Sequence, residues 1–411
     1  MGAAETASRT RNEHLTFRAN RDAGRHGWLR LTPAYSHRLV AEALERCGRQ
    51  RPVVCDPFSG SGTTGLVAAE QGHDAHLVDV NPFLVWFAAA KTRNYRPDEL
   101  AEVAEVAAHI VRQGPGVDAA ELWQPPLHRI ERWWRPEELA ALKALRYLID
   151  ETDLPPPGTD LLLVALCRTL IAVSDAAFDH QSMSFASRDS GGDGAPARTW
   201  ARWEDDVGAV LAGAATPLPG RVAAHLGDAR ALEEDLPRCV DVLFTSPPYA
   251  NRMSYVRELR PYMYWLRYLT EPRDAGELDW TAIGGTWGVA TSRVGSWEPT
   301  QELPLDGELA EVCERIRDSG GRNAELLARY VHKYTDDMWR HFRSAAGILN
   351  PGGRAIYVVG NSSFFGEVVP VQEWYAQLLV EAGFRDVSVT VIRKRNSNRA
   401  LFEYAVEATR P

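Results

Sequence analysis

Two acids and a set of glycines have the types and spacing needed to bind a nucleotide-like ligand. The segment C-D-P-F-S-G-S-G-T-T-G, residues 55–65, follows an apolar stretch and opens a helical pattern. Gly60 and Gly62 allow positive φ and let a ligand approach the backbone closely. Asp79 follows about twenty residues later, at the end of the next apolar run, in V-D-V-N-P. In a doubly wound sheet these strand ends lie side by side, and a carboxylate there can accept both hydroxyls of a ribose.

Three ligands could use such a loop. Gly60, Gly62 and Gly65 satisfy the G-x-G-x-x-G spacing, so NAD is one of them. Asp56 stands just ahead of the loop, where it would repel a pyrophosphate and attract a cation, and no lysine follows the last glycine as ATP would require. S-adenosylmethionine carries a sulfonium, an ammonium and a ribose but no phosphate, so it matches both acids best. The alternative is a structural strand–turn–helix corner that binds nothing.

A second segment, D-V-L-F-T-S-P-P-Y at residues 241–249, has the pattern of an apolar strand ending in two prolines. Prolines stop the ladder and stiffen the exit, which would hold Ser246 and the ring of Tyr249 above the sheet edge. A hydroxyl, an exposed carbonyl and an aromatic ring suit a flat base with an exocyclic amine. An isolated S-P-P-Y is common in loops, so its significance comes from the glycine loop expected in the same sheet.

The elements that must position these residues follow an α/β pattern. Short β-rich runs alternate with longer helical patterns, which indicates a parallel, doubly wound sheet. We expect helices over residues 63–71, 82–90 and 334–348, the last stopping at the P-G-G turn of residues 351–353. The expected strands are residues 53–56, 75–80, 223–226, 241–245, 354–359, 387–392 and 402–408.

Two long segments interrupt this alternation. Residues 95–220 are largely helical by pattern, with apolar spacings of three and four over 136–149 and 160–173. Residues 251–325 are rich first in aromatics and then in Gly, Thr and Ser. Without an internal repeat or a low-complexity linker, both are interpreted as insertions into one domain. The remaining regions are 1–94, with the cofactor-binding half of the core, 221–250, with the S-P-P-Y loop, and 326–411, with the last core strands.

Composition limits the class of protein. The 411 residues are 45% hydrophobic and 25% charged, as in an ordinary globular chain. We expect no membrane segment, because no apolar run approaches the roughly 20 residues that span a bilayer. The five cysteines lie far apart, which argues against a zinc site and fits a reducing cytoplasm. We expect no metal site, and we interpret lone histidines such as His180 and His332 as structural or surface residues.

The formal net charge of −9 opposes nucleic-acid binding, but its distribution is uneven. The first 51 residues carry ten arginines against five acids, and residues 385–399 are also basic. We expect the arginines of these two stretches to contact phosphates, including Arg393 and Arg395, and Arg252 and Arg257 to lie nearer the bases. A solvated acidic enzyme is equally compatible with the total charge.

Together, D-P-F-S-G-S-G-T-T, V-D-V-N-P and T-S-P-P-Y resemble the amino-group DNA methyltransferases, especially the N4-cytosine type. L-T-P-A-Y-S-H-R-L-V, residues 31–40, resembles the family's N-terminal cofactor-binding region, and P-G-G-R-A-I-Y-V-V-G-N with F-E-Y-A-V-E-A-T-R-P resembles its last three strands. The similarity covers roughly residues 25–95, 221–250 and 326–411. It implies a Rossmann-like class I methyltransferase fold, with a doubly wound, mostly parallel seven-stranded sheet interrupted here by the two insertions.

The resemblance also implies roles for particular residues. Asp56, Phe58, Gly60 and Gly62, with Thr63 beside them, would bind the methionine end of S-adenosylmethionine. Asp79 would bind the ribose, and Asp228, in L-G-D-A-R, the adenine amino group; the alternative for Asp228 is a helix N-cap. The catalytic loop would be Ser246, Pro247, Pro248 and Tyr249.

The implied activity is site-specific methylation of cytosine N4 in double-stranded DNA, with the target base flipped out of the helix. No cysteine accompanies the prolines, which argues against C5 methylation. One insertion falls before the strand that leads to Asp228, and the other falls after Tyr249, which differs from the family's usual arrangement. Which of the two recognises the DNA sequence therefore stays open, and residues 251–325 are one candidate. The chain shows no nuclease motif, so any restriction endonuclease partner would be a separate protein.

Four alternatives remain open at this point. The same fold could methylate adenine N6, or it could act on RNA or a small molecule. A non-catalytic DNA-binding subunit could retain the fold, although the intact acids and S-P-P-Y argue against it. A NAD-dependent dehydrogenase would leave S-P-P-Y unexplained.

Overall fold

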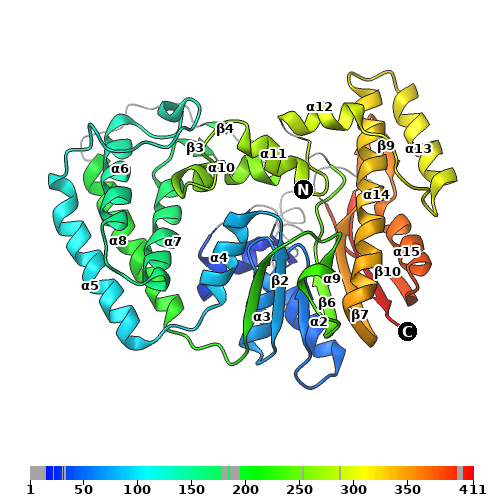
Figure 1. Cartoon of the computed structure of the whole chain (residues 1–411), viewed down its shortest axis with the longest axis horizontal. Coiled ribbons are helices and arrows are strands. Elements are labelled where there is room, and N and C mark those ends of the chain that lie inside the picture. Colours follow the sequence, from blue (N-terminus) through cyan, green and yellow to red (C-terminus); the bar gives the residue numbers. More distant parts are fainter. Residues whose placement is uncertain are drawn as a thin grey trace, which may run out of the picture.

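A seven-stranded sheet forms the centre of the protein, with strand order β10-β11-β7-β6-β1-β2-β5 (Figure 1). The structure is a computed structural model that describes residues 15–21, 23–29, 31, 34–177, 184–185, 195–251, 254–286, 288–395 and 401–411. The strands of this sheet are β1 (Val54–Asp56), β2 (Ala75–Asp79), β5 (Val222–Leu226), β6 (Val240–Thr245), β7 (Leu349–Gly360), β10 (Arg385–Lys394) and β11 (Phe402–Thr409).

The sheet is mostly parallel. β5, β2, β1, β6 and β7 pair in parallel, and β11 runs antiparallel between β7 and β10. This pattern confirms the expected Rossmann-like methyltransferase fold, and all seven expected strands are present. Because the parallel strands share a direction, the carboxyl ends of β1, β2, β5 and β6 meet at one edge of the sheet, where a doubly wound fold binds its ligands.

Helices cover both faces of the sheet. α2 (His37–Cys47) and α3 (Thr63–Glu70) pack on one face, while α14 (Ala324–Ile348) and α15 (Val371–Glu381) pack on the other. α4 (Pro82–Thr92) begins as its sequence predicts, since Pro82 occupies the first turn and the Asn81 side chain accepts the N–H of Phe83. Four-residue α9 (Leu232–Asp235) follows β5.

One boundary differs from the expectation. α14 ends at Ile348 as predicted but begins at Ala324 rather than at residue 334. The expected P-G-G turn is instead the irregular beginning of β7, where the register shifts against β6. Gly352 has a φ of 72°, and its N–H donates to the carbonyl of Arg410 at 2.7 Å. The last strand therefore fixes this segment as part of the sheet.

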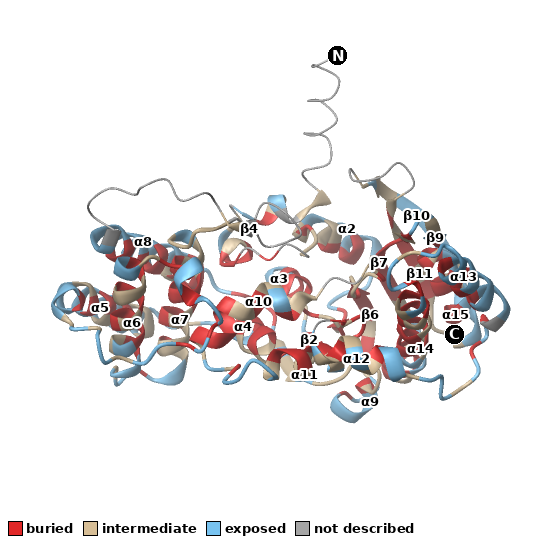
Figure 2. Ribbon diagram, turned by 90° about the horizontal axis from the view of Figure 1, so that it is seen from above, coloured by how far each residue is buried: buried red, intermediate tan, exposed pale blue. Residues whose placement is uncertain are grey.

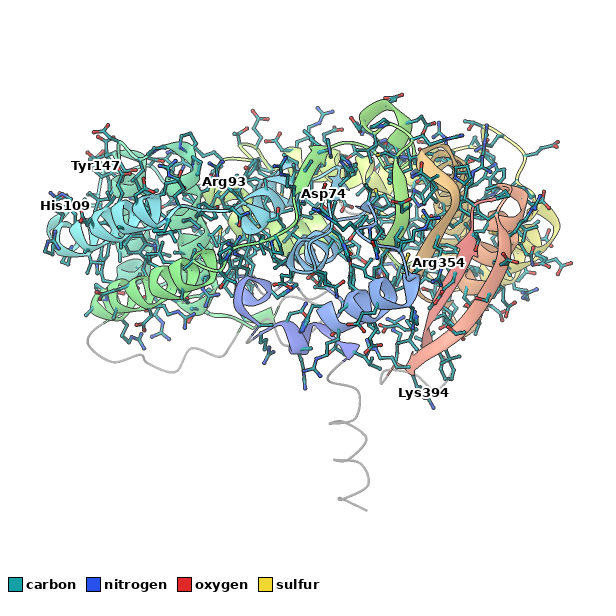
Figure 3. The ribbon with its side chains drawn as sticks, turned by 90° about the horizontal axis from the view of Figure 1, so that it is seen from below. Asp74, Arg93, His109, Tyr147, Arg354 and Lys394 are labelled. Carbon is teal, nitrogen blue, oxygen red and sulfur yellow. The ribbon has the colours of Figure 1, made fainter. Side chains whose placement is uncertain are left out.

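Residues 95–220 form a helical layer beside the sheet (Figure 1). Its core is continuous with α4 and with α10 (Tyr255–Trp265). Figure 2 shows buried residues along α4, α10 and α7 (Pro156–Ala172), which lie between the sheet and the outer helices. His109 and Tyr147 lie on its outer surface (Figure 3). Its elements are α5 (Pro97–Gln113), α6 (Pro136–Asp150), α7 (Pro156–Ala172), α8 (Ala195–Ala214), and the short pair β3 (Ala176–Ala177) and β4 (Ser184–Phe185).

The second insertion lies over the carboxyl edge of the sheet (Figure 1). Its helices are α10 (Tyr255–Trp265), α11 (Asp274–Thr281), α12 (Val289–Ser296) and α13 (Asp306–Asp318). A two-stranded hairpin, β8 (Ser362–Phe364) with β9 (Glu367–Val369), follows β7. Within the described residues, no helix is both long and apolar enough to cross a bilayer.

Arg25 ties the N-terminal segment to the helical layer. Its side chain is buried and donates to five main-chain carbonyls, those of Lys91 and Arg93 at the end of α4 and of Gly213, Ala214 and Thr216 at the end of α8. Arg93 lies between the layer and the sheet (Figure 3). The expectation that N-terminal arginines contact phosphates is therefore wrong for Arg25, because its donors are engaged inside the protein.

The packing at the end of α5 against α8 predicts that alanine substitutions at two neighbouring glycines will differ in their effect on stability. A methyl group at Gly114 would overlap the ring of buried Trp200, whereas one at Gly116 meets no atom within 4 Å. Gly114→Ala should therefore lower the free energy of unfolding by about 1–3 kcal/mol, the usual cost of overpacking. Gly116→Ala should be neutral or stabilise by up to about 1 kcal/mol. Urea unfolding of both variants tests this packing; equal stabilities would contradict it.

Candidate active site

A cavity of about 780 Å³ lies at the carboxyl edge of the sheet, beneath α10 and α11. Its volume is within the range of about 300–1,000 Å³ typical of ligand pockets. Residues of the glycine loop and of the S-P-P-Y loop line the same cavity, although the two motifs are far apart in the chain. Of the eleven site residues expected from the sequence, nine line it: Phe58, Gly60, Thr63, Asp79, Asp228, Ser246, Pro247, Pro248 and Tyr249.

Asp56 does not line the cavity. It is fully buried beneath the glycine loop, where its oxygens accept hydrogen bonds from the Tyr35 hydroxyl (2.6 Å), the Thr245 hydroxyl (2.6 Å) and the N–H of Phe58 (3.1 Å). This arrangement corrects the expectation of a direct contact with the cofactor. Since protein donors already occupy the carboxylate, its observed role is to hold the loop.

The glycine loop bends through two left-handed residues. Gly60 and Gly62 have φ of 48° and 70°. Gly62 lies outside the cavity wall, and a Cβ on it would come within 3.0 Å of Ala88 on α4, so it serves the turn and the packing of the helix. Lys91 supports the loop from behind, because its buried ammonium donates to the carbonyl of Ser61 at 2.8 Å. Burial lowers the pKa of Lys91 to about 7.

Asp79 stands at the wall of the cavity with only main-chain donors. Its carboxylate accepts from the N–H of Gly60 (3.0 Å) and of Asn81 (2.9 Å). Burial raises the pKa of Asp79 to about 6, because these two bonds only partly replace water. A ligand with a pair of hydroxyl donors would stabilise the ionised form.

Asp228 is held by a chain of charges that the sequence did not reveal. Arg230 contacts both of its oxygens and also bonds Asp337 (2.8 Å), which in turn pairs with Lys333 (2.6 Å). Burial acts to raise the pKa of Asp228, but the hydrogen bonds and the charge of Arg230 outweigh burial and lower it. The residue also accepts the N–H of Arg230, yet the N-terminal cap of α9 is Ala231 rather than Asp228.

The S-P-P-Y loop is fastened from two sides. The buried Tyr334 on α14 donates to the carbonyl of Pro248 at 2.9 Å, and the N–H of Tyr249 contacts the Tyr255 hydroxyl of α10 at 3.5 Å. Burial and the charge of Glu403 raise the pKa of Tyr249, while its hydrogen bond with Ser246 acts in the opposite direction. The hydroxyls of Ser246 and Tyr249 therefore face each other in the cavity wall.

Two arginines line the other end of the cavity. Arg393 forms a two-pronged ion pair with Glu403 (2.5 and 2.6 Å), and Arg395 lies over the ring of Tyr249. Both arginines line the cavity, and the guanidinium of Arg393 is paired with Glu403. Their expected contact with DNA phosphates stays a prediction. Arg257 is exposed on α10, and Arg252 and His180 lie outside the described residues.

His341 on α14 contacts both the glycine loop and the loop after β5 from the side of the core. It is fully buried, and its ring contacts Phe58 edge-on with centroids 4.9 Å apart. Nδ1 lies 2.8 Å from the carbonyl of Ala229, which can only accept, so Nδ1 carries the proton and Nε2 accepts from the Tyr357 hydroxyl at 3.0 Å. Burial lowers the pKa of His341 to about 4, against the opposing effect of the Ala229 carbonyl.

Among the described residues, no group of three or more His, Cys, Asp or Glu side chains lies close enough together to hold a metal ion. His332 instead packs edge-on against Trp297. The motifs gave no signal for Lys91 and His341, because each lies on a helix distant in sequence from the loop that it supports. Arg230 stands two residues after Asp228, but its second partner, Asp337, lies on α14 and becomes a neighbour only in the folded protein.

Comparison with known proteins gives one informative similarity. No family model matches the chain. The chain is 20% identical over 451 aligned residues to a type II methyltransferase, M.BsoBI of Geobacillus stearothermophilus. The alignment covers 96% of this chain and 86% of that protein, so it includes the sheet, the site and both insertions. A similarity of this length supports a shared architecture beyond the short motifs.

The buried His341 predicts acid sensitivity. Its pKa is about 4 in the folded protein and near 6.5 in the unfolded chain, so the unfolded chain binds more protons between these values. Stability from this residue is therefore complete above pH 6.5 and falls by about 3 kcal/mol as the pH drops to 4. Equilibrium unfolding across this range should show a shallower pH dependence for His341→Gln than for the wild type. His109→Gln, on the exposed face of α5, should keep the wild-type slope; a wild-type slope in His341→Gln would contradict the assignment.

Proposed function

We propose that the protein transfers a methyl group from S-adenosylmethionine to the N4 amino group of cytosine in double-stranded DNA, at specific sites. The observation that carries this proposal is the shared cavity, which joins the glycine loop and Asp79 to Ser246 and Tyr249. The similarity to a type II methyltransferase supports methyl transfer as the class of reaction. DNA as substrate and a separate restriction endonuclease as partner rest on the motif resemblance.

The residues of the first half of the cavity fit the cofactor. Asp79 is a half-buried carboxylate with no cationic partner among the described residues, as expected for an acceptor of ribose hydroxyls rather than a neighbour of phosphates. Asp228 offers acceptor oxygens in the same cavity for an adenine amino group, and Phe58 adds an apolar wall. When bound, S-adenosylmethionine supplies a methyl group on a positively charged sulfur.

The residues of the second half fit a base that has left its helix. An exocyclic amine is a poor nucleophile, because its lone pair is delocalised into the ring. The Ser246 hydroxyl and a carbonyl near Pro247 would accept its two N–H bonds and favour a tetrahedral nitrogen with a free lone pair. Their contribution is positioning and electrostatic stabilisation in a preorganised site. No cysteine lines the cavity, which fits N-methylation rather than attack through a covalent thiol adduct.

Cytosine is proposed over adenine because a serine heads the S-P-P-Y loop, as in the N4-cytosine members of the family that the motifs resemble. Nuclease digestion of DNA from a host that expresses the protein, followed by mass spectrometry of the nucleosides, tests this choice. N4-methylcytosine supports it. N6-methyladenine would show the same reaction class on the other base, and an unmodified DNA would contradict the proposal.

Asp79 should control both the affinity for the cofactor and its pH dependence. Asp79→Ala should weaken S-adenosylmethionine binding by roughly 1.5–3 kcal/mol, the scale of hydrogen bonds to a charged group. Hydroxyl donors stabilise the ionised form of Asp79, so cofactor binding should lower its pKa from about 6. Below pH 6 binding must then release a proton. The affinity for S-adenosylmethionine should therefore fall as the pH drops below 6 and be constant above it.

Calorimetry at several pH values measures both effects. Asp79→Asn should bind weakly with no pH dependence between 5 and 7. Asp74→Asn, next to the opposite end of the same strand (Figure 3), should bind as the wild type does. Wild-type affinity in Asp79→Asn would contradict the ribose assignment, and binding of NAD without S-adenosylmethionine would overturn the proposed function.

Ser246 should matter for turnover rather than for the cofactor. Removing one preorganised hydrogen-bond partner at a reacting centre lowers the rate by on the order of 10²–10³. Ser246→Ala should therefore bind S-adenosylmethionine normally and methylate DNA slowly in single-turnover experiments. Tyr249→Ala should in addition bind flipped-base DNA poorly, since aromatic stacking contributes roughly 1–3 kcal/mol per base. If the loop only packs a corner, both variants would lose melting temperature and keep their specific activity.

A further inference from the structure

Arg395 occupies an unusual position in the cavity. Its guanidinium carbon lies 5.5 Å from the centre of the Tyr249 ring, and Nη1 donates to the carbonyl of Asn361 at 3.2 Å. The Asn361 side chain in turn accepts the N–H of Phe402 at 2.9 Å. Asn361 follows β7 and Phe402 begins β11, so the sheet itself holds the arginine beside the S-P-P-Y loop.

The charges around Arg395 leave its remaining donors available. Glu403 and Glu258 are the carboxylates of this end of the cavity. Both oxygens of Glu403 are taken by Arg393. Within the part of the chain that the structure describes, no ion pair joins Arg395 to a carboxylate. A guanidinium has five N–H donors, and among the described residues Arg395 makes one hydrogen bond, from Nη1 to the carbonyl of Asn361.

We propose that Arg395 recognises the 2-oxo group of the flipped cytosine and thereby selects cytosine over adenine. The proposal rests on the proposed function, since it presupposes an amino group held at Ser246. Beside that amino group, cytosine presents two acceptors, N3 and O2. Adenine presents the acceptor N1 and then a C–H bond. The guanidinium of Arg395, next to Tyr249, can therefore donate hydrogen bonds to this edge of cytosine. Against adenine, the same guanidinium would face a C–H bond and have no acceptor in place of O2.

The principal rival explanation is a contact with a DNA phosphate, which an arginine makes equally well. The two roles differ in their consequences. A base contact changes the preference between bases and leaves the salt dependence of binding unaltered. A phosphate contact weakens binding to all DNA alike and reduces the slope of log affinity against log salt by about one.

The experiment compares Arg395→Met with Lys394→Met. Lys394 is the exposed neighbour at the end of β10 (Figure 3), and its loss removes the same charge from the same segment. The substrates are duplexes containing the site that the wild-type enzyme modifies, with either cytosine or adenine at the target position. Arg395→Met should lower kcat/KM for cytosine by about 10- to 100-fold, the scale of a lost bidentate base contact, with the salt slope and the activity on adenine unchanged. Lys394→Met should keep the wild-type ratio between the two bases.

A second measurement uses only the wild-type enzyme, so it does not depend on how the variant folds. The 2-aminopyridine C-nucleoside keeps the amino group and the adjacent ring nitrogen of cytosine but lacks the 2-oxo group. The wild type should methylate it about 10- to 100-fold more slowly than cytosine, and Arg395→Met should treat the two alike.

Two results would overturn the inference: equal wild-type rates on cytosine and on the 2-aminopyridine nucleoside, or a uniform loss of affinity in Arg395→Met with a reduced salt slope. The absence of N4-methylcytosine from wild-type reactions would instead refute the proposed function. The two failures are therefore distinguishable in the same set of assays.

Discussion

The carboxylate of Asp56 is the interaction on which the geometry of the site depends. Its acceptor oxygens join three segments: Tyr35 before α2, Phe58 in the glycine loop and Thr245 at the end of β6. Thr245 immediately precedes Ser246, so one buried group sets the glycine loop against the S-P-P-Y loop. An apolar residue at position 56 could not replace it, because the donors would then be buried without partners at a cost of about 1–3 kcal/mol each.

The same device recurs around the cavity. Each ligand-facing loop is supported from behind by a buried polar side chain from a different element: Lys91 of α4 for the glycine loop, His341 of α14 for the loop after β5, and Tyr334 of α14 for S-P-P-Y. α14 therefore holds two loops at once. Buried polar groups of this kind are costly unless satisfied, and once satisfied they allow few alternative arrangements. The loops around the cavity are therefore held by side chains that lie in the core.

The sequence predicts the strands and most of the residues that line the cavity, and the reason is local. Parallel strands that are buried on both faces give continuous apolar runs, and the polar residues after them mark the ligand edge. The sequence does not predict that the side chain of Asp56 points into the core rather than into the cavity. Its partners Tyr35 and Thr245 become neighbours only in the folded protein. The early start of α14 did carry a signal: Leu327, Tyr330, Val331, Tyr334 and Met338 have helical spacing and are all buried. Lys91 and Arg230 carry none, since a lone basic residue in a helix or turn has the same pattern on a solvated surface. Arg395 belongs to the basic stretch of residues 385–399, which predicts a contact with DNA but does not indicate a position in the cavity wall.

The distribution of charge inside the cavity makes the proposed function compatible with a net charge of −9. Asp79 and Asp228 lie at the cofactor half, where the proposed ligand carries positive charge, and Arg393 and Arg395 lie at the half that would receive the base. Four of these side chains have a clear assignment: Arg230 balances Asp228, and Glu403 balances Arg393. Asp79 and Arg395 form no ion pair among the described residues and would meet the proposed ligands. At physiological salt a surface charge is screened within about 8 Å, whereas charges in a partly buried cavity are screened much less. The few charges inside the site therefore have more influence on what binds there than the total charge of the chain.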